Sequence, residues 1–567
     1  MTRNVLRVSA AYGVAGLCLV LAARFASAGG LLPAVWVSRG VFVVVAAYPV
    51  VLAVAWMRDQ GAAGERDIDP WERYVGAAGL ACVLLAVAAG LRTADDGRPE
   101  PARPIAAATP RIVVLPLIDI DGGGDRYFVE GLTAELAAAL AMIEGVEVRG
   151  RASAVGFVDV NRDAAALGRR LGGDVVLDGT VRRYSGRLRL GVRIVEASTG
   201  NSVWSTSLDT TRAALFPLRD EAVRGVVGAL GLGPPDDRIL RRLDRRRSSA
   251  EALDLYMLGR HRGSGSRGDL LEAASYFHLA IEADSGFAPA WTALAEAYAT
   301  LPRFTRFPPD RARGEGAAAA RTALRLEPDA AAAHTVLGEI LYLYEHDWAG
   351  ARSHLERAVE LDPGQADPRE RLCELSLILG EVDEAEAACA EALNRDPLAF
   401  RPAWTGTWVD RSSGNLEAAL AGLDSLAKAH PDFEPLVADH AITRLVAGDT
   451  AALHGHLAAW FALLTSPELA DTLATALVEA WPPEPGGSAV VRAALARVEV
   501  DLDPSAVHLA ALLSLFGDRE RASEIAVAAL ADRMPGAIGL GVFPEFSALH
   551  EHDEFRRALA EAGLPVR

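Results

Sequence analysis

Four prolines recur at nearly equal spacing in the second half of this chain, and they constrain its fold more than any other feature. They are Pro328, Pro363, Pro397 and Pro431. The steps between them are 35, 34 and 34 residues, and each proline follows a segment with apolar residues at helical spacing. Proline has no backbone N–H and cannot continue a helix. The spacing therefore predicts repeated helical units between about Ala250 and Pro431.

A period of about 34 residues that ends on proline is typical of tetratricopeptide (TPR) units, each an antiparallel pair of amphipathic helices. Residues 291–298 and 334–338 resemble the first helix of such a unit, and residues 274–280 resemble the second. Small residues such as Gly338 would let the paired helices approach, while large ones such as Leu355 would fill the space between them.

A single helix pair cannot bury its apolar faces, so neighbouring units must stack into a solenoid. We expect this TPR array over residues 250–465. The register fades beyond Pro431, and residues 505–530 resemble another degenerate unit. We therefore expect a degenerate, TPR-like helical region over residues 466–567 that caps the array.

Three long apolar segments occupy residues 1–91. They are approximately Val8–Ala28, Leu31–Met57 and Tyr74–Leu91. The third holds 18 residues without a charge, about the length that crosses a bilayer core. Trp56 and Trp71 lie near segment ends, as interfacial aromatic residues do. We expect three transmembrane helices here, followed by a proline-rich linker over residues 92–110.

The first apolar segment also fits a cleavable signal peptide, because Arg3 and Arg7 precede it and the small residues Ala26–Ala28 end it. Both alternatives place the chain after the third segment on the same side of the bilayer. The two arginines favour a cytoplasmic N-terminus. We therefore expect a multi-pass protein of the cytoplasmic (inner) membrane, with its large C-terminal region periplasmic or otherwise extracytoplasmic.

The charge of the chain is unevenly divided. The net charge of −18 is made up of +5 over residues 1–250 and −23 over residues 251–567. An acidic repeat region repels a phosphate backbone, so we expect no nucleic acid among the partners. The basic run Arg238–Arg247 lies in a predicted linker, residues 231–249. It is either a solvated linker or a point of attachment to an anionic surface.

Residues 111–230 have the pattern of an α/β domain. The expected strands are 112–117, 146–149, 174–181, 188–194 and 202–208, and the expected helices are 127–143, 163–171 and 216–230. The last two strands alternate apolar and polar residues and are joined by a turn at 198–200. This order implies a mixed sheet with helices packed on it. The fold class is thus a multidomain membrane protein with transmembrane helices, an α/β domain and an all-α TPR solenoid.

The same region resembles the TolB-like amino-terminal domain family, including members fused to TPR arrays. The matching segments, in order, are Ile112–Leu117, Tyr127–Leu136, Arg149–Ser153, Val176–Arg182 and Gly200–Ser205. The first residues of the chain, from Arg3 onward, also resemble the membrane leader of such proteins. Relatives of this kind carry winged-helix DNA-binding domains or are named cyclases. Only about seven residues precede the first predicted span, so we expect neither activity here.

Few residues have the spacing that catalysis or metal binding requires. Lys428, the only lysine, lies in a repeat helix, which excludes a Walker-type phosphate loop. His454 and His456, like His550 and His552, are two residues apart and do not align on one helix face. We expect these histidines at the surface. We predict no enzyme activity, no catalytic residue, no cofactor and no metal site.

Two groups of residues in the folded regions invite more specific hypotheses. Glu135, Arg149 and Arg151 are either an ion-pair group that ties the first helix to the second strand, or a ligand site. Cys373 and Cys389 lie on the two helices of one predicted repeat, at positions that face each other. They would form a disulfide in an oxidising compartment, and would otherwise be buried free thiols.

Two functions follow from these patterns. The first is a membrane-anchored, non-enzymatic scaffold that holds a protein or peptide partner in the concave surface of its TPR solenoid, outside the cytoplasmic membrane. The alternative is a sensory or regulatory subunit whose α/β domain binds a small ligand and signals across the membrane. In both, the lipid bilayer is a partner of residues 1–91.

Overall fold

A computed structural model describes a large part of the C-terminal region. The described residues are 109–121, 126–154, 162–184, 187–211, 215–233, 239, 248–263, 267–305, 307–450, 452–482, 489, 491–493 and 506–566. The predicted membrane segments, most of the proline-rich linker and most of the basic run Arg238–Arg247 lie outside them. Residues Ala102–Arg567 form one compact unit. Among the helices that the structure describes, none is both long and apolar enough to cross a membrane.

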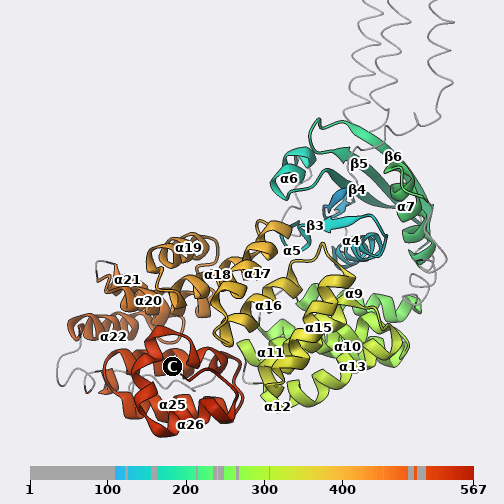
Figure 1. Cartoon of the computed structure of the whole chain (residues 1–567). Coiled ribbons are helices and arrows are strands. Elements are labelled where there is room, and N and C mark those ends of the chain that lie inside the picture. Colours follow the sequence, from blue (N-terminus) through green and yellow to red (C-terminus); the bar gives the residue numbers. More distant parts are fainter. Residues whose placement is uncertain are drawn as a thin grey trace, which may run out of the picture. The chain divides into compact units, whose positions relative to one another are not determined.

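A six-stranded mixed sheet forms the first folded part (Figure 1). Its strands are β1 (Arg111–Val114), β2 (Ile118–Asp119), β3 (Glu147–Arg149), β4 (Val175–Tyr184), β5 (Arg187–Glu196) and β6 (Ser202–Thr210). The order is β3-β1-β4-β5-β6, with β2 beside β4. Strand β1 is parallel to β3 and β4, whereas β4, β5 and β6 are antiparallel. The observed sheet is mixed, as the pattern predicted.

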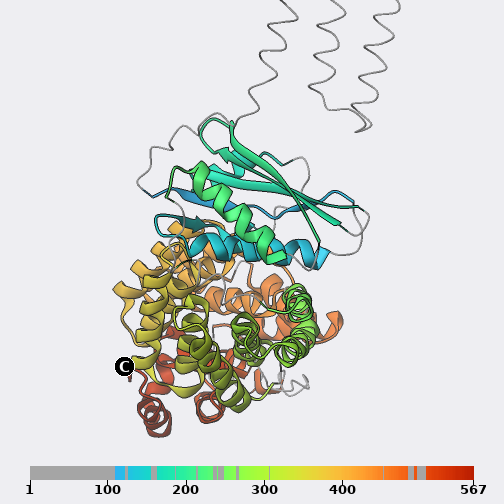
Figure 2. The same cartoon turned by 90° about the vertical axis from the view of Figure 1, so that its right-hand side faces the viewer.

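Side chains of β1 alternate between the two faces of the sheet, so both faces carry apolar residues that helices cover. Ile112 and Val114 pack in the same apolar core as helices α4 (Arg126–Ala141) and α7 (Leu215–Ala229). Val113 packs on the other face with α6 (Ala164–Arg170). Figure 2 shows α4, in blue, and α7, in green, under one face of the sheet. A short helix, α5 (Arg151–Ala154), follows β3.

Antiparallel helix pairs build the second part. They are α9 (Ala250–Gly263), α10 (Arg267–Ala283), α11 (Ala288–Phe304), α13 (Ala317–Leu326), α14 (Ala331–Ile340), α15 (Trp348–Leu361), α16 (Asp367–Ile378), α17 (Val382–Arg395), α18 (Phe400–Ser412), α19 (Leu416–Ala429), α20 (Glu434–Ala447), α21 (Leu453–Ala462) and α22 (Pro467–Glu479). Helix α12 (Pro309–Arg311) and a π-helical turn, η2 (Ala312–Gly316), precede α13, and a second π turn, η3 (Leu341–Glu345), continues α14. Figure 1 shows the pairs stacked side by side.

The repeat period has a direct structural cause. Helices α13, α15, α17 and α19 each end two residues before the proline of their repeat. Within one pair, Gly338 of α14 lies against Leu355 of α15, and a Cβ atom on Gly338 would meet Leu355 Cγ at 2.8 Å. The small residue therefore permits the close approach of the two helices. The predicted solenoid of stacked helix pairs is confirmed.

The chain after α22 adds further helices and also folds back onto earlier repeats. It contains α24 (Ala506–Leu515), α25 (Arg519–Ala531), the 3-10 segments η4 (Pro535–Gly541) and η5 (Pro544–Glu551), and α26 (Asp553–Glu561). Segment η4 contacts α11 and α16, which are far earlier in the chain, and η5 contacts α20. Nη1 of Arg533 donates a hydrogen bond to the carbonyl of Tyr344 at 2.7 Å. The C-terminal residues thus pack back against the repeats.

Candidate functional site: the inner surface of the repeats

Two cavities border the first helices of the repeat pairs. The larger, about 520 Å³, lies between α4 and α5 of the sheet region and the helices α9, α11, α14 and α16. The smaller, about 110 Å³, is walled by α11, α16, α18, α20 and α24 together with η4 and η5. The inner surface of this array is therefore shared between the sheet region and the C-terminal segments.

Acidic groups dominate the charged lining of the larger cavity. Its carboxylates are Glu130, Glu135, Glu296, Glu327, Asp329, Glu339, Asp362 and Asp367, and its guanidinium groups are Arg151, Arg260 and Arg371. Each of the three arginines already pairs with a carboxylate of the lining, at N···O distances of 2.7–3.1 Å. Other carboxylates of the lining pair with arginines outside it: Glu130 with Arg126, Glu135 with Arg219 and Asp329 with Arg357. The lining is acidic by its residues, and Asp367 is the clearest point of attraction for a cationic group.

Asp367 shows the electrostatic consequence of this lining. Its side chain is open to the cavity, but the surrounding walls remove the carboxyl from bulk water, and this desolvation raises its pKa. The negative charges of Glu296 and Glu370 raise the pKa further, while Arg371 opposes the change. Its one described hydrogen bond comes from Nε2 of Gln365 at 3.3 Å. A positive charge placed in the cavity would stabilise the ionised form of Asp367.

The polar group expected from the sequence is divided in the structure. Buried Glu135 accepts a hydrogen bond from Nη1 of Arg219 on α7, at 3.3 Å. Among the described residues neither Arg149 nor Arg151 pairs with Glu135, so the predicted ion pair between the first helix and the second strand is wrong. Arg151 pairs with Asp362 at 2.9 Å instead. Glu135 and Arg151 line the larger cavity, and Arg149 does not.

Arg149 belongs to a junction that sequence reasoning missed. Its Nη1 donates to the carbonyl of Asn394 at 3.0 Å, and the amide of Gly150 donates to the carbonyl of Arg395 at 3.2 Å. Nη1 of Arg395 in turn pairs with Glu147 at 2.8 Å. The amide of Ser153 in α5 also donates to Oδ2 of Asp396, at 3.1 Å. These contacts fasten β3 and α5 to the end of α17. The partners lie about 245 positions apart, and no local pattern could have indicated them.

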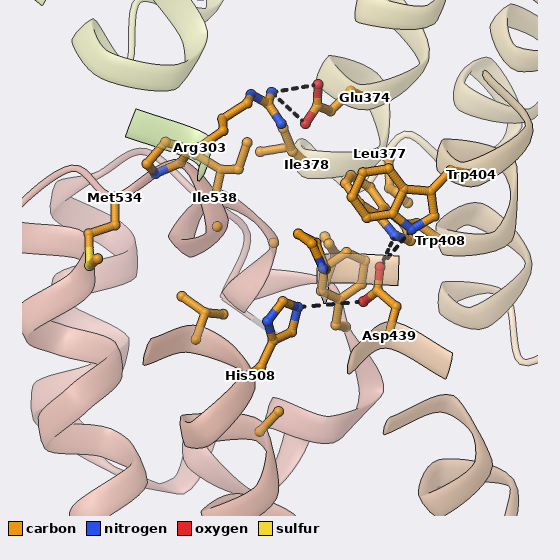
Figure 3. Close-up of a pocket in the computed structure, with 18 of the residues that line it drawn as sticks. Arg303, Glu374, Leu377, Ile378, Trp404, Trp408, Asp439, His508, Met534 and Ile538 are labelled. Atoms are coloured by element: carbon orange, nitrogen blue, oxygen red, sulfur yellow. Dashed lines mark hydrogen bonds and ion pairs between the residues drawn. The ribbon is translucent and has the colours of Figure 1, made fainter. Parts of the chain in front are cut away.

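The smaller cavity has aromatic walls and four acidic lining residues, Glu374, Glu434, Asp439 and Glu545 (Figure 3). Trp404 and Trp408 of α18 both donate their indole N–H to Oδ2 of Asp439, at 2.8 and 2.7 Å. His508 of α24 brings Nε2 to 3.8 Å from Oδ1 of the same carboxylate. Because Asp439 already has these neighbours and the volume is small, this cavity is a packed junction between the repeats and the C-terminal helices.

A buried ionic network borders both cavities. Arg303 lies 3.0 Å from Glu374, which also accepts a hydrogen bond from the hydroxyl of Tyr342 at 2.6 Å. Burial alone would raise the pKa of Glu374, but Arg303, Arg401 and Arg371 hold this pKa at about 2. The network is therefore charged at neutral pH. Such buried pairs fix the relative positions of the helices that carry them.

The cysteine pair and one histidine pair also have defined positions. Cys373 of α16 and Cys389 of α17 are joined by a disulfide in the structure, with Cα atoms 5.2 Å apart. His456 is half-buried rather than at the open surface, because its ring lies 4.1 Å from the ring of buried His440. His454, His550 and His552 have the same intermediate exposure, so all four histidines are partly at the surface.

A family comparison agrees with this arrangement of helices. The family model of the tetratricopeptide repeat matches residues 342–404. The C-terminal part of the chain carries a TPR array. Similar solved structures include a thermophilic TPR protein of Thermus thermophilus, with 20% identity and a TM-score of 0.30 over 34% of this chain and 99% of that one. Another is PilW, a type IV pilus biogenesis factor, with 19% identity and a TM-score of 0.31 over 38% and 93% of the two chains.

One curated relative shares a longer stretch of sequence. The chain is 30% identical over 190 residues to putative adenylate cyclase 3 of Rhizobium meliloti (strain 1021). The match covers 33% of this chain and 32% of that protein, so the chain spans about a third of the length of its relative.

Proposed function

We propose that this protein is a membrane-anchored, non-enzymatic scaffold whose TPR array binds a positively charged segment of a protein partner in the larger cavity. Residues 1–91 anchor it in the cytoplasmic membrane, residues 111–230 form a TolB-like domain, and the folded region lies on the outer side. One observation carries the proposal: the 520 Å³ cavity on the inner surface of the repeats has a net acidic lining.

The volume and the charge together define the partner. A cavity of this size admits a few side chains of an extended or turn segment rather than a folded domain. Asp367 faces the cavity with one described hydrogen bond, from Gln365, so a lysine or arginine side chain would gain a charge-assisted contact there. Nucleic acid does not fit, since its phosphates would face the same carboxylates.

The acidic lining does not suit the cyclase reaction that the name of the Rhizobium meliloti relative indicates. A nucleoside triphosphate carries several negative charges and would be repelled from the larger cavity. The three arginines there are already paired with Asp362, Glu296 and Glu339. We therefore propose no cyclase activity for the described region.

A cavity-filling variant tests the scaffold proposal. Ala332 is exposed and lines the larger cavity, so Ala332→Trp should block it. Ala318 is an exposed alanine of α13 outside this lining, so Ala318→Trp is the matched control. We expect a fluorescent arginine-rich peptide to bind the wild-type chain and the control, and to bind Ala332→Trp at least about tenfold more weakly. Equal binding by all three chains, or preference for a glutamate-rich peptide, would contradict the proposal.

Membrane topology needs a separate measurement. A reporter fused after Arg567 that is active only in the periplasm should function, and a reporter active only in the cytoplasm should not. The reverse result would place the repeats inside the cell.

A second candidate function is supported by the two-sided wall of the same cavity. Because α4 and α5 of the sheet region face repeat helices across it, an occupant would change how the two parts contact each other. A small cationic metabolite could then act as a signal, as in a sensory subunit. Thermal-shift measurements with spermidine separate the candidates: stabilisation by spermidine without binding of the arginine-rich peptide favours the sensor.

A further inference from the structure

Three side chains with metal-ligand chemistry meet where α19, α20 and α21 pack together. They are Asp424 of α19, His440 of α20 and His456 of α21. One ligand atom from each lies within 4.8 Å of the others. Nε2 of His440 is 3.0 Å from Oδ1 of Asp424, and the two imidazole rings are 4.1 Å apart. No two of these residues are close in sequence, which is why the spacing of His454 and His456 alone did not indicate the group.

His440 gives the second, independent indication of a ligand. Its side chain is only 2% exposed, and its Nε2 makes no hydrogen bond with any described residue despite its closeness to Asp424. A buried nitrogen without a hydrogen bond is unfavourable, because it has lost its contact with water and gained no partner in exchange. This nitrogen lies close to the carboxylate of Asp424, in a geometry that makes no hydrogen bond, and the ring lies beside the second histidine. An ion that accepts its lone pair would remove the cost.

We propose that Asp424, His440 and His456 bind a divalent transition-metal ion, with Zn²⁺ the best match to two imidazoles and one carboxylate. Zn²⁺ takes three such protein ligands and completes its tetrahedron with water or another ligand. Two nitrogens and one oxygen do not suit Ca²⁺ or Mg²⁺, which prefer oxygen alone. The site would join three successive helices and so brace the array beyond the last regular proline repeat.

Arg444 is the main competitor for the carboxylate. Its Nη2 lies 2.8 Å from Oδ1 of Asp424, and its Nη1 pairs with Asp449. Because the guanidinium group has this second carboxylate, it can remain paired when an ion takes Asp424. Removal of Arg444 should accordingly strengthen metal binding. If Arg444 only held the helices in place, its removal would weaken metal binding instead.

Cobalt provides a direct test, because Co²⁺ replaces Zn²⁺ and its visible absorption reports tetrahedral coordination. The experiment uses the full-length chain in detergent, without a histidine tag and freed of metal by chelation. We expect one equivalent of Co²⁺ to give this absorption and one equivalent of Zn²⁺ to remove it. Zn²⁺ should also raise the melting temperature.

Matched variants locate the site. His456→Ala should bind Co²⁺ at least about tenfold more weakly, since even the loss of a residue that only orients a metal ligand costs about 10–100-fold in affinity. His454→Ala, two residues earlier on α21, should bind like the wild type. Because His440 is buried and its loss could unfold the helix, Asp424→Asn serves as the second variant. The absence of a Co²⁺ spectrum in the wild-type chain, or equal spectra in His456→Ala and the wild type, would overturn the proposal.

Discussion

Both carboxylate oxygens of Glu374 lie 3.0 Å from Nη2 of Arg303, although the two residues are 71 positions apart in the chain (Figure 3). The pair connects α11 to α16 across the inner surface of the array. Both side chains are almost fully removed from solvent, with 10% and 2% of the side chain exposed. The ion pair therefore depends on each partner to compensate for the loss of water by the other.

Removal of one partner should be costly. Arg303→Met leaves a buried carboxylate with one fewer cation, so we expect the free energy of unfolding to fall by about 3–5 kcal/mol. The measurement is denaturant unfolding followed by circular dichroism. Arg357→Met is the control, because the Arg357–Glu360 pair is solvent-exposed and its loss should change the stability far less. Equal effects of the two variants would mean that the Arg303–Glu374 pair is not desolvated.

Glycines of the repeat helices should differ sharply in their tolerance of a methyl group. A Cβ on Gly338 would meet Leu355 Cγ at 2.8 Å, so Gly338→Ala should destabilise the array by about 1–3 kcal/mol. A Cβ on Gly406 of α18 meets nothing within 4 Å. Gly406→Ala should therefore stabilise by about 0.5–1 kcal/mol through helix propensity. Opposite shifts in thermal melting are expected, and shifts of the same sign would contradict this packing.

The repeated helix pairs could be predicted from the sequence, whereas the contacts between segments far apart in the chain could not. Pro328 and its equivalents stop helices at a constant phase, and that information is local, so the register of the array could be predicted. The Glu135–Arg219 and Arg149–Asn394 contacts depend on which surfaces meet after folding. The charged residues at these interfaces do not recur at a regular spacing along the sequence. For the same reason His440, one histidine in an otherwise ordinary helix, did not stand out.

The disulfide can be counted by thiol labelling. The chain has four cysteines, of which Cys373 and Cys389 lie in the array. If these two are joined in the protein, denatured full-length chain should label at two thiols without reductant and at four with it. Four labelled thiols without reductant would show that the array cysteines are free. Replacing both cysteines by alanine should cost roughly 3 kcal/mol, the value for closure of a loop of about 15 residues.

His346 should make stability fall in mild acid. Burial, followed by the charge of Arg533, lowers the pKa of His346 to about 4 from an ordinary value of 6.5. Between these values the unfolded chain takes up a proton that the folded chain does not. The contribution of His346 is therefore fully present above about pH 6.5 and is lost as the pH falls towards 4.

His346→Asn isolates this effect. The residue has φ of 57°, a left-handed conformation that asparagine tolerates. We expect the melting temperature of the variant to decline less steeply than that of the wild type between pH 7 and pH 4.5. A matched substitution of exposed His430 by asparagine should keep the wild-type slope. Parallel slopes for wild type and His346→Asn would show that this histidine is not desolvated.

The fastening of β3 and α5 to the end of α17, together with the packing of α4 on α9, has a mechanical consequence. A row of helix pairs behaves as a coil spring whose pitch can open or close. Here the spring is clamped at two separated points, near residues 250–263 and 394–396, by one rigid sheet. Stretching the repeats between these points must first shear the clamp. A pull on the repeats between these two points would thus displace the sheet rather than uncoil the helix pairs.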